Sequence, residues 1–129
     1  MKVLVTGANG FVGRALCCHL DTHRHAVVLA VRRASGLAGE VVLGNIDCMT
    51  DWTAALDGCD AVVHLAARVH VMHDTTADPL ALYRATNTDV TLNLARQAAQ
   101  AGVKRFVFIS SIKVNGEGRD TAYRETDAP

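Results

Sequence analysis

The first thirteen residues constrain the fold more than any other stretch, because they set glycines between a short apolar run and an amphipathic one. Residues 3–5 have the length and β-branched content of a buried strand. Three glycines follow at intervals of three: Gly7, Gly10 and Gly13. Apolar residues then recur at helical spacing: Val12, Leu16, Cys17 and Leu20. A helix that begins in a glycine turn can bind a phosphate through its unpaired N–H groups and positive dipole end. A tight turn with no ligand is the alternative.

Length and composition indicate one domain without a charged tail. The chain has 129 residues, 50% of them hydrophobic, and a formal net charge of +0. This balance gives no sign of a nucleic-acid partner. No apolar run reaches the ~18 residues of a membrane span, so we expect no membrane association and a cytoplasmic protein. We expect four free thiols in or near the core, since no cysteine pair has the CxxC spacing: Cys17, Cys18, Cys48 and Cys59.

Apolar runs alternate with helical stretches along the rest of the chain. The runs predict strands at residues 3–5, 26–31, 40–43, 61–65 and 105–109. A short helix is predicted from Asp51 to Leu56, ended by Gly58. A long helix is predicted over 79–101, with Pro79 in its first turn and Gly102 at its end. Polar residues 68–78 predict a loop, and residues 115–129 show no clear period.

This alternation predicts an α/β fold, a Rossmann-like doubly wound parallel sheet with the strand order 3-2-1-4-5. Helices would cover both faces of the sheet. The ends of strands 1 and 4 would flank the switch point, where such sheets bind their ligands.

Four motifs occur in a characteristic order: Thr6-Gly7-x-x-Gly10-Phe11-x-Gly13, His64-Leu65-Ala66-Ala67, Asn87, and the run from Phe106 to Ser111. Together they resemble the N-terminal part of an extended short-chain dehydrogenase/reductase, of the NAD-dependent epimerase/dehydratase group that acts on nucleotide sugars. The string from Ser110 to Glu117 resembles 4-epimerases or 4-keto reductases of bacterial polysaccharide synthesis. The resemblance implies that residues 1–129 form an NAD(P)-binding domain, with the sheet incomplete at its C-terminal side and the substrate domain absent.

The resemblance assigns a cofactor site. It places the pyrophosphate over the three glycines, with backbone N–H groups from Phe11 and Val12. It places the adenine beside Asn45 and Ile46, with Asp47 as the alternative, although relatives carry Asp where Asn45 stands. Small side chains along the cofactor would come from three consecutive residues: Leu65, Ala66 and Ala67.

Arg32 and Arg33 favour NADP over NAD. Relatives that prefer NAD end the second strand with an acidic residue that holds the ribose diol, and Val31 stands there in this chain. A guanidinium suits a 2′-phosphate in charge and in geometry. An exposed arginine pair without a ligand is the alternative.

The resemblance also assigns catalytic parts. It gives Ser111 a hydrogen bond to the substrate oxygen, beside a Tyr that acts as general acid and base and a Lys that lowers the pKa of that Tyr. It lets Asn87 support this Lys through water, and Lys113 and Asn115 could reach the substrate. His64, on an apolar strand, reads better as a satisfied core histidine than as a catalyst.

The Tyr-x-x-x-Lys pair does not occur in these residues. Asn87 and Asp127 stand four residues after the two tyrosines, Tyr83 and Tyr123. We therefore expect an N-terminal piece of an epimerase, dehydratase or 4-keto reductase that binds its cofactor without turnover. A non-catalytic dinucleotide-binding module, regulatory or redox-sensing, is the main alternative, and an atypical reductase is a weaker one. An in-frame Tyr-x-x-x-Lys downstream of Pro129 would favour the enzyme.

Two further expectations concern partners and metals. The nucleotide sugar is the expected substrate of the longer relative. A fifth strand at an exposed edge predicts a homodimer or other self-association. His70, His73 and Asp74 lack a third ligand at a persuasive spacing, so we expect no metal site there.

Overall fold

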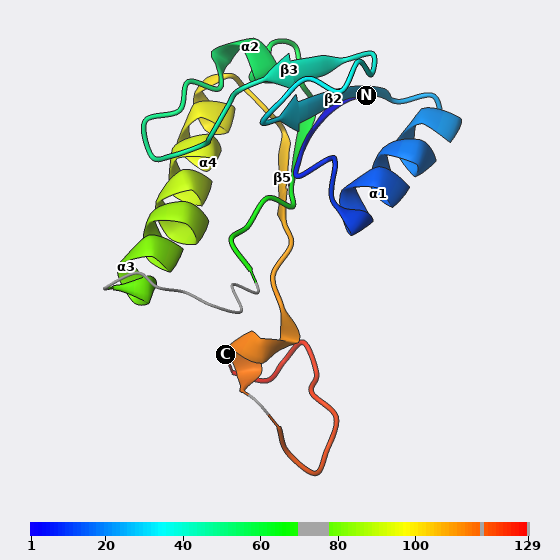
Figure 1. Cartoon of the computed structure of the whole chain (residues 1–129). Coiled ribbons are helices and arrows are strands. Elements are labelled where there is room, and N and C mark those ends of the chain that lie inside the picture. The colour runs from blue at the N-terminus through cyan, green and yellow to red at the C-terminus, as the bar shows by residue number, and fades with distance from the viewer. Residues whose placement is uncertain (70–77, 117, 129) are drawn as a thin grey trace.

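Five parallel strands form one sheet in the computed structural model, which describes residues 1–69, 78–116 and 118–128 (Figure 1). The strands are β1 (Lys2–Thr6), β2 (Ala26–Val31), β3 (Glu40–Val42), β4 (Ala61–His64) and β5 (Arg105–Phe108). Their order in the sheet is β3-β2-β1-β4-β5. The predicted fold class and strand order are therefore confirmed, and the observed bounds differ from the predicted ones by one residue at some strand ends.

Two apolar layers lie on opposite faces of the sheet, because alternate residues of each strand point to opposite sides. On one face, Leu4 and Val62 pack with residues of α2 (Thr53–Leu56) and α4 (Val90–Gln100). On the other face, Val3 and Val5 pack against α1 (Phe11–Thr22). Figure 1 shows α1 and α4 on opposite sides of the strands. Burial on both faces explains why the strands read as continuous apolar runs instead of alternating ones.

The long predicted helix over 79–101 is interrupted. It consists of α3 (Pro79–Arg84), a π-helical segment η1 (Ala85–Asp89) and α4. The prediction of one continuous helix was therefore wrong in its middle. The Thr91 hydroxyl donates to the Asn87 carbonyl oxygen at 2.7 Å, and such back-bonding by threonine disturbs a regular helix. π-Helical turns inside α-helices are frequent at functional sites.

The residues predicted to begin or end helices lie at or near the observed helix ends. α2 begins at Thr53, and Asp51 accepts from the Thr53 backbone N–H at 2.9 Å without being the formal cap. Asp78 caps α3 by accepting from Ala81 N, and Pro79 lies in the first turn. Gly102 follows α4 with a φ of 78°, the left-handed conformation that ends many helices.

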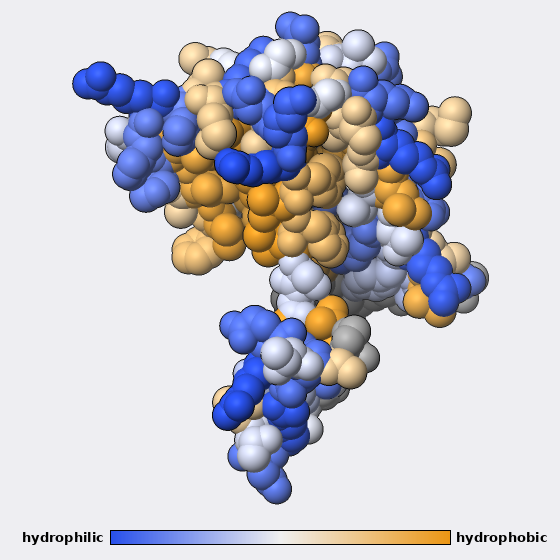
Figure 2. Space-filling model, turned by 180° about the vertical axis from the view of Figure 1, so that it is seen from behind, coloured by the Kyte–Doolittle hydropathy of each residue, from blue (hydrophilic) through white to orange (hydrophobic). Residues whose placement is uncertain are grey.

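The C-terminal residues lie away from the main body (Figure 1). Ile112–Asn115 form a 3-10 turn, η2, that the sequence did not predict. Seen from behind, the main body carries an extended apolar area (Figure 2). The exposed apolar side chains include Val107 at 44% and Ile109 at 50% of their full surface, on β5 and just after it. The edge strand β5 is thus exposed, as predicted.

The thiols and the helices bear on two sequence expectations. All four cysteines are free, as expected, but the prediction that they lie in or near the core was wrong for Cys18 and Cys48, which are exposed. Burial raises the pKa of the Cys17 and Cys59 thiols. Among the described residues, no helix has the length and apolar character needed to span a bilayer.

Candidate functional site

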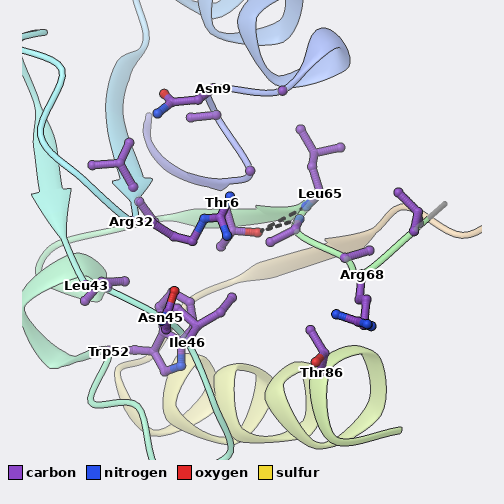
Figure 3. A pocket seen from close by; sticks show the side chains of 18 of the residues that line it. Thr6, Asn9, Arg32, Leu43, Asn45, Ile46, Trp52, Leu65, Arg68 and Thr86 are labelled. Carbon is purple, nitrogen blue, oxygen red and sulfur yellow. Dashed lines mark hydrogen bonds between the residues drawn. The ribbon is translucent and has the colours of Figure 1, made fainter. Parts of the chain in front are cut away.

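A cavity of about 850 Å³ opens where the carboxyl ends of β1, β2 and β4 meet. From β1 the chain continues to β2 and β3 on one side, whereas β4 and β5 lie on the other, so this is the switch point of the sheet. In Figure 3, Asn45, Ile46 and Trp52 lie on one side of the cavity, and Arg68 and Thr86 lie on the other. The volume is in the range of small-ligand sites.

The glycine turn packs so closely that side chains cannot replace two of its glycines. Gly7 has a φ of 68°, and a Cβ there would lie 2.9 Å from Ala66 N. A Cβ on Gly13 would lie 2.2 Å from the Gly7 carbonyl oxygen and 2.8 Å from Ala8 Cα. Both neighbours are backbone and cannot turn aside. Gly7 and Gly10 line the cavity, while Gly13 holds the helix against the turn behind it.

Helix α1 begins beside the cavity with an uncapped N-terminus. Gly10 is the N-cap. No side chain makes a capping hydrogen bond at this end of the helix, and the first turn carries no acidic residue. Phe11 is 96% exposed. Phe11 and Val12 are not among the described residues that line the cavity, so the contact of their backbone N–H groups with a ligand stays a prediction. Unpaired N–H groups at a positive dipole end form an anion site.

Asn45, Ile46 and Trp52 form the wall beyond β2 and β3. The loop that carries them is tied to α4: Gln97 accepts from Trp52 N and donates to the Thr50 carbonyl oxygen, each at 2.8 Å. The Trp52 ring is fully buried, and its Nε1–H has no hydrogen-bond partner among the described residues. Asn45 and Ile46 thus line the cavity, and their contact with an adenine stays a prediction; Trp52 was not foreseen as part of the site.

The segment after β4 forms the opposite wall. Leu65, Ala66 and Ala67 line the cavity, the residues that the resemblance places along the cofactor. Leu65 N and Ala66 N each donate to Thr6 Oγ1 at 3.1 Å, which fixes this segment to the end of β1 (Figure 3). Small side chains next to a fixed backbone leave the cavity open at this point.

His64 lies beneath this wall and outside the cavity. It is 1% exposed and bonds Thr6 through Nδ1 at 2.7 Å and Thr91 through Nε2 at 2.9 Å. Burial lowers the pKa of His64 to about 4, so the imidazole is neutral near pH 7. The interpretation as a satisfied core histidine agrees with this geometry.

Asn87 holds the wall from the side of the helix. Its Oδ1 accepts from Arg68 N at 2.7 Å, and its Nδ2 donates to the Arg68 carbonyl oxygen at 3.0 Å. The resemblance implied a water-mediated contact between Asn87 and a lysine; the described residues show only the two bonds of the side chain to the Arg68 backbone, and that role stays a prediction. The Arg68 guanidinium lies 5.6 Å from the centre of the Tyr83 ring, and Arg68 lines the cavity.

The two arginines after β2 differ in position. Arg32 lines the cavity, and Arg33 is not among the described residues that do so. Both are exposed. A ligand in the cavity would therefore meet Arg32 in preference to Arg33.

Ser111, Lys113 and Asn115 are not among the described residues that line the cavity. Ser111 is exposed, and its Oγ accepts from Lys113 N at 3.3 Å. Asn115 Nδ2 donates to the carbonyl oxygens of Asp127 and Ala128 at 3.2 and 3.0 Å. The structure thus does not bring the predicted catalytic and substrate residues to the predicted cofactor site.

Sequence reasoning missed Thr6, Trp52, Arg68 and Thr86. Thr6 stands inside the glycine motif, and Trp52 is the single tryptophan of the chain, so both offered a signal. Arg68 and Thr86 become part of the site only through the arrangement of β4 and η1. His70, His73 and Asp74 lie outside the described residues, and no cluster of three metal-ligating side chains occurs in the residues that are described.

Fold and cavity together define a Rossmann-like α/β domain with a phosphate-type glycine turn at its switch point. The chain belongs to the NAD dependent epimerase/dehydratase family, whose model matches residues 3–129.

Three comparisons illustrate the relationship. A UDP-glucose 4-epimerase of Vibrio cholerae is 51% identical over 122 residues, which cover 91% of this chain and 37% of that protein. A 3-beta-hydroxysteroid dehydrogenase of Mycolicibacterium neoaurum is 34% identical over 134 residues, covering 99% and 37%. The solved structure of MoeE5 in complex with UDP-glucuronic acid and NAD is 33% identical with a TM-score of 0.82, covering 100% of this chain and 42% of MoeE5. The chain thus spans about two fifths of the length of these relatives.

Proposed function

We propose that the cavity binds NAD or NADP and that the chain supplies the dinucleotide-binding part of an enzyme acting on nucleotide sugars. The observation that carries the proposal is the glycine turn packed against the β4 wall at the switch point, beside the uncapped start of α1. The reaction class would be epimerisation, dehydration or 4-keto reduction. The NAD and UDP-glucuronic acid of MoeE5 and the UDP-glucose 4-epimerase of Vibrio cholerae support this class.

The described residues fit such a ligand. A Cβ at Gly7 or Gly13 would collide with neighbouring backbone, so these glycines permit the tight turn that sets the first turn of α1 beside the cavity, where the pyrophosphate would bind. Asn45 and Ile46 would flank the adenine. Ala66 and Ala67 would leave space for a ribose along the other wall. The bound dinucleotide would supply the hydride acceptor or donor, and these residues would only bind and orient it.

Ser111 would donate a hydrogen bond to a substrate oxygen, with Lys113 and Asn115 close to the sugar. This role requires the segment after β5 to lie against the cavity, which the described structure does not show. We therefore expect these 129 residues to bind the dinucleotide without turning over a UDP-sugar. The test is the absorbance of reduced cofactor during incubation with UDP-glucose, and measurable oxidation or reduction would contradict the expectation.

We further propose that NADP binds more tightly than NAD, because Arg32 lines the cavity at the end of β2. A hydrogen bond to a charged group contributes about 1.5–3 kcal/mol, and exposure of Arg32 reduces this, so we expect about a tenfold loss of NADP affinity in Arg32→Ala. Arg33→Ala, the matched control, should change the affinity less. Calorimetric titration with both cofactors measures the effect, and equal affinities of the unaltered chain for NAD and NADP would contradict the preference.

A second copy of the chain is the partner that we propose for the exposed edge of β5. Val107 and Ile109 are about half exposed there, and an unpaired strand edge offers free N–H and C=O groups. Light scattering should show a dimer or larger species whose fraction rises with concentration. A monomer at all concentrations would contradict self-association.

A further inference from the structure

His64 is the most buried polar side chain near the cavity that the proposed function leaves without a role. It is 1% exposed, and its ring stacks on Phe108 with centroids 6.0 Å apart. Its two ring nitrogens bond hydroxyls from different elements, Thr6 at the end of β1 and Thr91 in α4. A buried imidazole between two hydroxyls can exist in more than one arrangement of protons, and the neighbouring bonds select one.

The hydrogen bonds of Thr91 determine which ring nitrogen of His64 carries the hydrogen. The Thr91 hydroxyl donates to the Asn87 carbonyl oxygen at 2.7 Å, because a carbonyl can only accept. A hydroxyl has a single hydrogen, so Thr91 Oγ1 can only accept from His64 Nε2, at 2.9 Å. The neutral imidazole is therefore the Nε2–H tautomer.

The tautomer of His64 then determines the bonds of Thr6. His64 Nδ1 carries no hydrogen and must accept from the Thr6 hydroxyl at 2.7 Å. Both lone pairs of Thr6 Oγ1 are thereby left for the two backbone N–H groups of Leu65 and Ala66, each at 3.1 Å. If Nδ1 carried the hydrogen instead, Thr6 Oγ1 would face three donors with two lone pairs, and one bond would be lost.

The chain of hydrogen bonds through His64 and Thr91 also reaches Arg68. Thr91 bonds the carbonyl oxygen of Asn87, and the Asn87 side chain holds Arg68 through its backbone N–H and carbonyl oxygen. The cavity wall after β4 is thus fixed at two points, Leu65–Ala66 and Arg68, and His64 connects both.

We propose that His64 is a positioning residue: its fixed Nε2–H tautomer sets the wall formed by residues 65–68 in the shape that receives the dinucleotide. The inference rests on the proposed function for its ligand. This role differs from simple core packing, because the packing of a histidine that only fills space does not depend on which ring nitrogen carries the hydrogen.

Thr91→Val tests the inference without altering a residue that lines the cavity. Valine keeps the shape but cannot accept from Nε2–H, so the bond that selects this tautomer is lost. The Nδ1–H form, in which one N–H of Leu65 or Ala66 has no acceptor, should therefore gain population. We expect faster amide exchange at one of these two residues and about a fivefold weaker NADPH affinity, the effect of one lost hydrogen bond. Thr88→Val, an exposed threonine in the same helical region, is the matched control and should change neither.

Three measurements decide the outcome. Long-range ¹⁵N–¹H NMR of the unaltered chain should show His64 as the Nε2–H tautomer, and an Nδ1–H tautomer would overturn the inference. In a His64→Phe background, Thr91→Val should lose only what its bond to the Asn87 carbonyl oxygen contributes, so its effect on affinity should be smaller than in the unaltered chain. Equal losses in the two backgrounds would overturn the connection through His64. If His64→Phe does not fold, the tautomer and the amide exchange of Thr91→Val decide alone.

The failure of the two proposals can be told apart. If the unaltered chain binds NADPH and Thr91→Val binds it equally well, the role of His64 is overturned and the proposed function stands. If the unaltered chain binds neither NADPH nor NADH, the proposed function is overturned, and the ligand of this inference with it.

Discussion

The walls of the cavity and the segment after β5 differ in how far along the chain their bonds reach. In the walls, Thr6 bonds His64 across 58 residues, and Gln97 bonds Thr50 across 47. In the C-terminal segment, Arg119 pairs with Asp127 across 8 residues, and Asn115 bonds Asp127 across 12. The walls are therefore fixed by the sheet and by α4, whereas the segment that carries Ser111 is held mainly by its own neighbours.

This difference separates binding from catalysis in the molecule. The proposed cofactor residues come from loops that follow β1, β2, β3 and β4, all of which the sheet aligns at one edge. The proposed catalytic residues follow β5, at the border of the sheet, where one side is exposed. Changes in the walls should therefore alter binding and stability, and changes in the C-terminal segment should not.

The largest expected effect is that of Gly13→Ala. The new Cβ would lie 2.2 Å from the Gly7 carbonyl oxygen, and the backbone would have to move. Overpacking of this kind costs about 1–3 kcal/mol or more, so we expect a loss of dinucleotide affinity approaching 100-fold, together with lower stability. Gly10→Ala, whose Cβ would lie 3.1 Å from the same oxygen, should lose less. Titration of both variants measures the ratio, and unchanged affinity in Gly13→Ala would contradict the described turn.

The second effect is a dependence of stability on pH that comes from His64. Its pKa is about 4 in the folded chain against 6.5 for the free side chain, so the unfolded state binds the proton more readily. Stability should therefore be full above pH 6.5 and fall by about 3 kcal/mol as the pH drops through 4. Urea unfolding between pH 7 and 5 checks the upper part of this window.

The control for this prediction is His64→Phe, which should remove the slope between pH 6.5 and 5. The carboxyl groups of Glu40 and Asp51 also have lowered pKa values, through hydrogen bonds from Ser35 and Thr53, and they act below this range. A flat stability profile between pH 6.5 and 5 in the unaltered chain would be the contrary result.

A smaller effect is expected from Gln97→Ala at the other wall. The change removes the bonds to Trp52 N and to the Thr50 carbonyl oxygen. Loss of these bonds should lower the free energy of unfolding by about 1–2 kcal/mol and weaken dinucleotide binding. Gln100→Ala, an exposed glutamine on the same helix, is the matched control. Equal results for the two variants in urea unfolding and in titration would show that this wall does not depend on α4.

The smallest effect is expected at Ser111. The residue is exposed and does not line the described cavity, so Ser111→Ala should change stability by less than about 0.5 kcal/mol and leave the dinucleotide affinity unchanged. Calorimetric titration of the variant beside the unaltered chain measures this. A clear loss of affinity would place the segment after β5 at the cavity and remove the contrast between the two regions.

The sequence predicted the fold because its signals are local. Each strand is a continuous apolar run, and Gly102 and Pro79 mark helix ends by their own backbone preferences. The π-helical interruption at Ala85–Asp89 was not predictable in this way. It depends on the bond between Thr91 and Asn87 and on the contact of Asn87 with Arg68, which only the folded chain brings together.

The site was predictable only where its signals are also local. The turn at Gly7, Gly10 and Gly13 carries its own signature, since the clash of a Cβ with the adjacent backbone is a property of the turn itself. Arg68 and Thr86 enter the cavity through long-range packing, and no local pattern marks them. Ser111 was given its role by resemblance alone, and it is not among the described residues that line the cavity.

The most direct test of the account uses Trp52, the single tryptophan of the chain and part of the cavity wall. Titration with NADPH and NADH should quench its fluorescence saturably, with transfer of energy to the reduced nicotinamide. Competition with oxidised NADP should reverse both effects. The same titration of Gly13→Ala should show a much weaker response. If Trp52 fluorescence of the folded chain does not respond saturably to either cofactor, the cavity is not a dinucleotide site and the central claim is wrong.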